Sequence, residues 1–127
     1  MTADPKVLIL DDEPEIALEL SDYLTINGFP NLYSIDPYDA LQFIKRYASI
    51  KLILLDRRMP IMDGYEFIKR AKKLIDHGRS IKFVIITGHL TDVDFNQAAL
   101  NGADSVLPKP IDLGRLKNIV EKTISSP

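Results

Sequence analysis

The sequence contains no cysteine, which excludes disulfide bonds and thiolate metal sites. No apolar run is as long as a membrane-spanning helix, and the N-terminus lacks the charged and then apolar pattern of a secretion signal. Neither charge dominates: 16 Lys and Arg against 18 Asp and Glu give a formal net charge of −2, which is no basic footprint for nucleic acid. We therefore expect a cytoplasmic protein that binds neither membranes nor nucleic acid directly.

The chain also lacks internal repeats, low-complexity tracts and linkers, apart from a short polar tail at its end. Its 127 residues are 46% hydrophobic, which is enough to bury a sizeable core. We predict a single domain over residues 1–127, with an ordered core at about 5–125.

The most informative stretch runs from Leu52 to Gly64. Four consecutive apolar residues lead directly into Asp56 and then into a loop that contains proline and glycine. A short, unbroken apolar run is typical of a strand that is buried on both faces of a parallel sheet. Asp56 would then lie at the carboxyl end of the strand, where open α/β sheets place their ligand crevices.

Strands are expected to alternate with helices along the whole chain. Apolar runs predict strands at 6–10, 31–35, 52–55, 81–86 and within 104–108. Helical spacing and capping signals predict helices at 14–26, 37–48, 64–75, 91–101 and 113–124, of which the fourth has a poor apolar stripe. Asp36 and Asp112 are predicted helix caps, and Asp63 is predicted to shape the turn before Gly64. The alternation predicts an α/β fold of three layers, with a parallel sheet between helices.

Polar side chains follow four of these strands: Asp11 and Asp12 the first, Asp56 the third, Thr87 the fourth and Lys109 the fifth. Parallel strands end at the same edge of a sheet, so we expect these residues to meet there. Neighbouring carboxylates raise one another's pKa, and a hard divalent cation relieves the repulsion; Mg²⁺, or Mn²⁺ in its place, fits such a site. A lysine ammonium and a threonine hydroxyl suit a phosphoryl group on Asp56.

Four motifs in order resemble the response-regulator receiver domain of two-component signalling: ILDDE at 9–13, LDRRMPIMDG at 55–64, ITG at 86–88, and GAD at 102–104 leading to Lys109-Pro110. The resemblance covers nearly the whole chain. It implies a flavodoxin-like (βα)5 fold with a five-stranded parallel sheet in the strand order 2-1-3-4-5.

The resemblance also implies a role for each residue of the site. The implied phosphoacceptor is Asp56, and the implied metal ligands are Asp12, Asp11 largely through water, and the backbone carbonyl of Arg58. Thr87 and Lys109 would contact the phosphoryl oxygens, and the bond from Lys109 to Pro110 would be cis.

The implied function is to accept a phosphoryl group and to signal by a conformational change, with catalysis limited to the domain's own phosphorylation and dephosphorylation. The implied partners are a sensor histidine kinase or a histidine phosphotransfer protein. Either would dock at the rim of the site and on the first helix. Ile16 and Leu20 are candidate contacts there, with a place in the core as the alternative for each. The resemblance also allows a homodimer through the fourth helix, fifth strand and fifth helix. The downstream partner, and whether the domain stands alone or belongs to a larger protein, stay open.

Three positions bear on output and phosphoryl lifetime. Val106, three residues before Lys109, stands where the family usually has an aromatic that moves with Thr87. Arg58 and His89 lie two residues after the phosphoacceptor and the threonine, where side chains vary in the family and influence lifetime. We expect the weakly patterned fourth helix to carry the response in place of an aromatic switch.

Three other functions remain open from the residues alone. A receiver-like domain that only docks partners should have degraded acidic residues, whereas these are complete. A phosphatase of the haloacid-dehalogenase kind needs a second aspartate two residues after the first, where Arg58 stands. A flavin-binding module of this fold needs a hydroxyl- and glycine-rich loop after the first strand, where Asp11, Asp12 and Glu13 would repel phosphate.

Overall fold

The computed structural model describes residues 4–76, 78–88 and 92–125, in which strands and helices alternate strictly. The elements are β1 (Val7–Leu10), α1 (Pro14–Ile26), β2 (Asn31–Ser34), α2 (Pro37–Arg46), β3 (Leu52–Asp56), α3 (Gly64–Leu74), β4 (Lys82–Thr87), α4 (Asp92–Leu100), β5 (Ser105–Pro108) and α5 (Leu113–Ser125). Every helix within the described ranges is too short or too polar to cross a lipid bilayer.

The five strands form one parallel sheet in the order β2-β1-β3-β4-β5, which confirms the predicted topology. The chain adds β2 on one side of β1 and then crosses back to add β3 on the other side. The order therefore reverses between β1 and β3, which is the place where sheets of this type open a crevice at their carboxyl ends.

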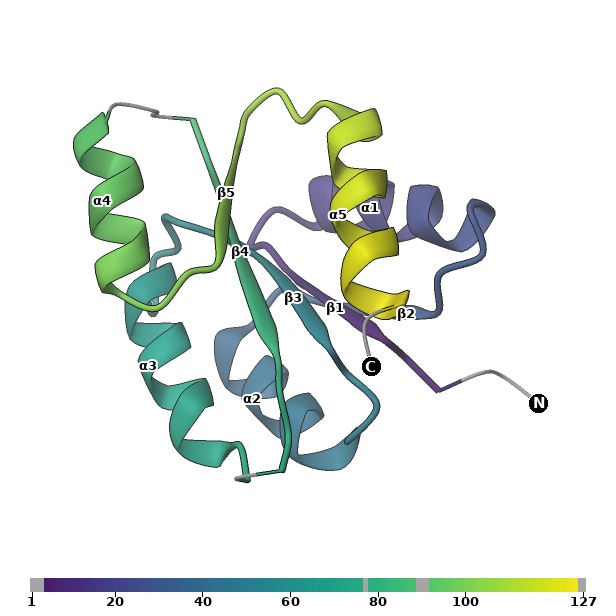
Figure 1. Ribbon diagram of the computed structural model, residues 1–127, viewed down its shortest axis with the longest axis horizontal. Coiled ribbons are helices and arrows are strands. Elements are labelled where there is room, and N and C mark those ends of the chain that lie inside the picture. The colour runs from purple at the N-terminus through teal and green to yellow at the C-terminus, as the bar shows by residue number, and fades with distance from the viewer. Residues whose placement is uncertain (1–3, 77, 89–91, 126–127) are drawn as a thin grey trace.

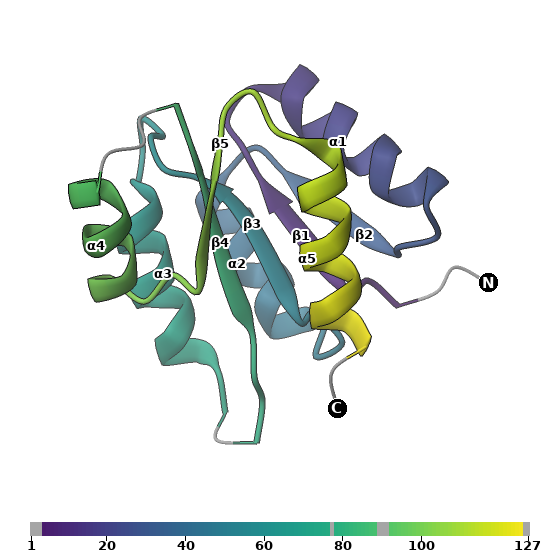
Figure 2. The ribbon, with the colours of Figure 1, turned by 45° about the horizontal axis from the view of Figure 1, so that its top comes forward.

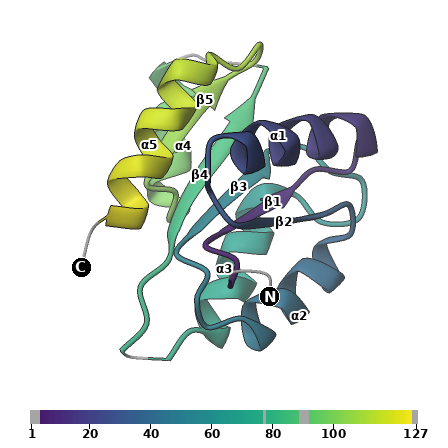
Figure 3. The same cartoon turned by 90° about the vertical axis from the view of Figure 1, so that its right-hand side faces the viewer.

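Helices cover both faces of the sheet, giving the predicted three layers. α2, α3 and α4 lie on one face, and α1 and α5 lie on the other (Figures 1 and 3). Alternate residues of β1 point to opposite faces of the sheet. Val7 and Ile9 pack with α1 and α5, while Leu8 and Leu10 pack with the layer of α2, α3 and α4. All four are at most 1% exposed, which is why this strand reads as an unbroken apolar run.

Three aspartates begin helices. The side chain of Asp36 accepts the backbone N–H groups of Tyr38 and Asp39, and that of Asp112 accepts those of two residues in the first turn of α5. Both predicted caps are confirmed. Asp63 does more than shape a turn, because its Oδ1 accepts the N–H of Glu66, 3.0 Å away, and so caps α3.

The element ends differ slightly from the prediction. β3 and β4 each extend through the polar residue that follows the apolar run, Asp56 and Thr87. α2 ends at Arg46 and not at residue 48, because Arg79 from the loop before β4 donates to the carbonyls of Ile44 and Tyr47. A tertiary contact thus satisfies the orphan carbonyls at the end of this helix.

β4 and β5 end at the top of Figure 1, and Figure 2 brings this edge of the sheet toward the viewer. The register aligns these ends: Asp56 pairs with Ile86, and Thr87 pairs with Pro108. The residues that follow each strand therefore emerge at one level, on the same edge of the molecule.

Candidate functional site

Three carboxylates meet where β1 and β3 end. Leu10 pairs with Leu55 in the register of these strands, so the next residues, Asp11 and Asp56, lie side by side. Asp12 joins them, and one carboxylate oxygen from each of the three lies within 4.8 Å of the others. Asp11 is 2% exposed and Asp56 is 8% exposed, so the group is largely shielded from solvent.

Asp11 bears the electrostatic cost of this arrangement. Burial is the largest cause that raises its pKa, from 3.8 to about 6, and the negative charges of Asp56 and Asp12 add to it. The backbone N–H of Glu13, 2.9 Å from Asp11 Oδ1, and the charge of Lys109 act in the opposite direction. Crowded carboxylate oxygens are the ligands that a hard divalent cation prefers, and the residues present therefore fit Mg²⁺.

Lys109 reaches the same carboxylates from the end of β5. Its Nζ lies 3.1 Å from Asp56 Oδ1. Burial lowers the pKa of Lys109, but the hydrogen bond and charge of Asp56, together with the charges of Asp11 and Glu13, raise it by more. The peptide bond from Lys109 to Pro110 is cis, as predicted. A positive charge thus contacts the candidate phosphoacceptor directly.

Thr87 completes the group at the end of β4. It is 7% exposed, and its backbone carbonyl accepts the N–H of Lys109 at 2.8 Å. Since Thr87 follows Ile86, the strand partner of Asp56, it lies one residue beyond the carboxylate along the next strand. The structure therefore gathers at one edge all five residues that the sequence predicted there.

The loop between β3 and α3 passes close to Asp56. A Cβ atom on Gly64 would lie 2.9 Å from the backbone oxygen of Asp56 and 3.3 Å from Arg57 Cα, so only glycine fits. Arg58 is exposed. The sequence prediction missed Arg57 and Tyr65, which contact each other across this loop. The only available signal was an arginine next to the phosphoacceptor, which could equally be a solvated residue.

Other predicted residues have mixed outcomes. Val106 is 5% exposed and belongs to the core beside α2, α3 and α4. His89 lies outside the described residues. Leu20 was an alternative contact for partners, but it is core, with 5% exposure. Ile16 is half-buried against the same core cluster, whereas Leu18, which no pattern singled out, is 45% exposed on α1.

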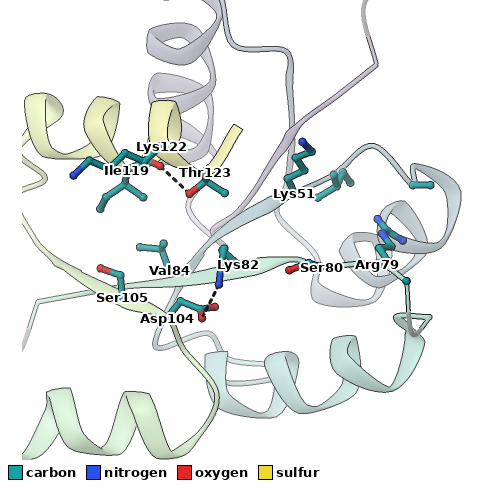
Figure 4. A pocket seen from close by; sticks show the side chains of 13 residues that line it. Lys51, Arg79, Ser80, Lys82, Val84, Asp104, Ser105, Ile119, Lys122 and Thr123 are labelled. Atoms are coloured by element: carbon teal, nitrogen blue, oxygen red, sulfur yellow. Dashed lines mark hydrogen bonds and ion pairs between the residues drawn. The ribbon is translucent and has the colours of Figure 1, made fainter. Parts of the chain in front are cut away.

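A separate cavity of about 790 Å³ lies at the opposite end of the sheet, under the last turns of α5 (Figure 4). Several basic residues line it, and two of them have a role in the fold. Lys82 faces Asp104 with Nζ 3.8 Å from Oδ1, and Arg79 holds the end of α2. None of the predicted site residues lines this cavity. We therefore place the candidate site at the carboxylates and not in this cavity.

Comparison with known proteins agrees with this geometry. Residues 7–121 match the response regulator receiver domain family. The chain is 33% identical over 116 residues to a probable chemotaxis protein CheY of Rhizobium etli, covering 91% of this chain and 89% of that protein. It is 32% identical over 124 residues to a transcriptional regulatory protein CpxR homolog of Haemophilus influenzae, covering 94% of this chain. The chain spans 52% of that regulator, which is about half its length.

A solved structure has the same fold. The co-crystal of the Saccharomyces cerevisiae histidine phosphotransfer signaling protein Ypd1 with the receiver domain of its downstream response regulator Ssk1 contains a chain that superposes with a TM-score of 0.84. That match is 20% identical and covers 97% of this chain and 90% of the other. Because a match to the family spans nearly the whole sequence, the chain belongs to the response regulator receiver domain family of two-component signalling.

Proposed function

We propose that Asp56 accepts a phosphoryl group from the phosphohistidine of a sensor histidine kinase or a histidine phosphotransfer protein. The observation that carries the proposal is the 3.1 Å contact between Lys109 Nζ and Asp56 Oδ1, beside two further carboxylates. The carboxylate of Asp56 is largely shielded from water and held against the ammonium of Lys109, which would stay beside the phosphoryl group after the transfer.

The phosphohistidine and Asp56 are the only reactants that the transfer needs. A carboxylate oxygen of Asp56 forms a bond to phosphorus while the bond from phosphorus to the donor's imidazole nitrogen breaks, and the imidazole leaves with the electron pair. Lys109 would then neutralise part of the charge on the phosphoryl oxygens, and the Thr87 hydroxyl would donate a hydrogen bond to one of them.

The same carboxylates would also hold the divalent cation. We infer that Asp12, Asp11 and Asp56, with the backbone carbonyl of Arg58, hold Mg²⁺ or Mn²⁺ in solution. The three carboxylate oxygens that lie within 4.8 Å of one another support this assignment. When bound, the cation would offset negative charge on the transferring group.

Catalysis would be limited to the domain's own phosphorylation and dephosphorylation. Arg58 stands where an aspartate-dependent phosphatase needs a second acid, and its side chain is exposed. A module that only docks partners is also a weaker explanation, because it has no use for a buried Asp11 and a lysine held against Asp56.

Docking on the first helix is consistent with the surface of α1. Leu18 is 45% exposed in the first half of this helix, which begins at the edge that carries Asp56. The yeast receiver was solved together with a histidine phosphotransfer protein, which supports a partner of that class for this chain.

Intact-mass spectrometry with a small phosphodonor tests the central step. With Mg²⁺ and acetyl phosphate, the wild-type mass should rise by one phosphoryl group, and EDTA should prevent the gain. Asp56→Asn should abolish it, whereas Asp22→Asn, the same change of charge at an exposed position of α1, should leave it intact. A modification that persists in Asp56→Asn, or a wild type that no donor modifies, would contradict the proposal.

A further inference from the structure

Arg57 occupies the position between the phosphoacceptor and Arg58. Its backbone is held on both sides: its N–H donates to the carbonyl of Ile86 at 3.0 Å, and its carbonyl accepts the N–H of Gly64 at 3.0 Å. The loop of residues 57–63 is therefore closed at its base, next to Asp56, before any side chain contributes.

The side chain of Arg57 also contacts residues at the other end of the same loop. Its guanidinium carbon lies 3.9 Å from the centroid of the Tyr65 ring, a distance at which cation–π attraction is strong. One guanidinium nitrogen lies 3.9 Å from Asp63 Oδ2, while the other oxygen of Asp63 caps α3. The side chain of Arg57 is 28% exposed and Tyr65 is half-buried, so the ring contact is partly shielded from water, whereas the side chain of Asp63 is 51% exposed.

We propose that Arg57, Asp63 and Tyr65 form a clamp that positions the loop for the divalent cation. The inference rests on the proposed function and deepens it, because Asp56 and the carbonyl of Arg58 flank Arg57. The three are positioning residues: they set the direction in which the chain leaves β3, and they do not contact the phosphoryl group.

The physical reason is preorganisation. Mg²⁺ requires near-octahedral geometry with oxygen distances of about 2.0–2.1 Å. A free loop would have to be ordered when the cation binds, and that entropy cost would weaken the affinity. A loop that is already fixed at its base and by the clamp avoids most of this cost, in the way that groups beyond the ligands tune other metal sites.

Tyr65 is the residue to change, because it is uncharged. Substituting Arg57 or Asp63 would alter the charge near the cation, and Asp63 also caps α3. Tyr65→Leu removes the aromatic face but keeps apolar contact with the core against which this residue packs. Tyr65→Phe keeps the face and should behave as wild type.

A second arginine–tyrosine pair provides a matched control. Arg70 lies 5.9 Å from the centroid of the Tyr38 ring and pairs with Glu66 at 3.0 Å. Tyr38 lies in α2 and Arg70 in α3, so their contact joins two helices outside the loop of residues 57–63. Tyr38→Leu therefore reproduces the chemical change away from the clamp.

Isothermal titration with Mg²⁺ alone measures the affinity without any phosphodonor. We expect Tyr65→Leu to raise the Kd by roughly three- to tenfold, which is the range of one partly shielded cation–π contact. Tyr65→Phe and Tyr38→Leu should stay within about twofold of wild type. With acetyl phosphate, Tyr65→Leu should need more Mg²⁺ for half-maximal rate but reach nearly the wild-type rate at saturation.

Three results would overturn the inference: an unchanged Kd in Tyr65→Leu, an equal loss in Tyr38→Leu, or an equal loss in Tyr65→Phe. A wild type that binds no Mg²⁺ would overturn the proposed function and the clamp together. If wild type and Tyr65→Leu bind Mg²⁺ with equal affinity, the clamp alone is overturned. Urea unfolding of each variant shows that the titrations are made on folded protein.

Discussion

The buried carboxylate Asp11 should make the metal-free domain less stable at neutral pH than a neutral side chain would. Its pKa is about 6 in the folded protein, against 3.8 as its ordinary value, and burial is the main cause. Asp11→Asn removes the charge, keeps the shape, and leaves an oxygen that can still accept the N–H of Glu13. The substitution should therefore stabilise the fold in the absence of metal.

The change in stability caused by Asp11→Asn follows from the linkage between protonation of Asp11 and folding. The folded state holds this proton more tightly, so ionisation of Asp11 costs nothing below pH 3.8 and reaches its full cost above about pH 6. The rise in the pKa of Asp11 from 3.8 to about 6 corresponds to a loss of about 3 kcal/mol of folding stability when this carboxyl is ionised. Residual hydration of the site reduces this figure, so we expect a gain of about 1–3 kcal/mol at pH 7.5 and little at pH 4. The gain corresponds to a rise in Tm of about 4–12 °C for a domain of this size.

Thermal and urea unfolding followed by circular dichroism, in EDTA, measure the effect at both pH values. Asp22→Asn removes the same charge from an exposed position of α1 and should shift the stability by less than about 0.5 kcal/mol. Adding Mg²⁺ at pH 7.5 should stabilise the wild type more than Asp11→Asn, because the variant has lost a carboxylate. The reasoning fails if Asp11→Asn is no more stable than wild type at pH 7.5, or if it gains as much at pH 4.

Two further predictions concern the surfaces around the site. Leu18→Glu should slow phosphotransfer from a histidine phosphotransfer protein while leaving acetyl phosphate labelling of Asp56 nearly unchanged. The control is Ile26→Glu, at the far end of α1, where the residue is 85% exposed. Equal slowing by both variants would argue against docking at Leu18. With beryllofluoride and Mg²⁺ as a phosphoryl mimic, hydrogen exchange should change mainly in α4 and its flanking loop. A larger change in β5 around Val106 would contradict this.

The sheet and its polar edge could be predicted because their signals are local. A strand that is buried on both faces must be apolar throughout, so β1 and β3 stand out in the sequence. Parallel strands end together, so Asp11, Asp56 and Lys109 could be expected to meet even though they are far apart in the chain. Asp36 and Asp112 were equally visible, since a cap depends only on the few residues that follow it.

The clamp and the partner surface depend on contacts that no local pattern encodes. Arg57 contacts Tyr65 only because the loop closes tightly on Gly64. On α1, helical spacing places Leu20 in the apolar stripe but does not show whether a residue of that stripe stays accessible to a partner. The structure buries Leu20 and leaves Leu18, which lies off the stripe, 45% exposed.

The structure also suggests where a change at Asp56 can spread. β3, β4 and the middle of β5 are fixed between two layers, and Val106 is a stiff, buried side chain with no ring to swing. By contrast, Ala98 is the single buried residue among the α4 side chains that the structure describes, and Phe95 and Leu100 are 45% and 80% exposed. An element with so little buried apolar surface has a low free energy of local rearrangement. Because α4 also follows Thr87 along the chain, we expect it to be the element that a new charge on Asp56 displaces most easily.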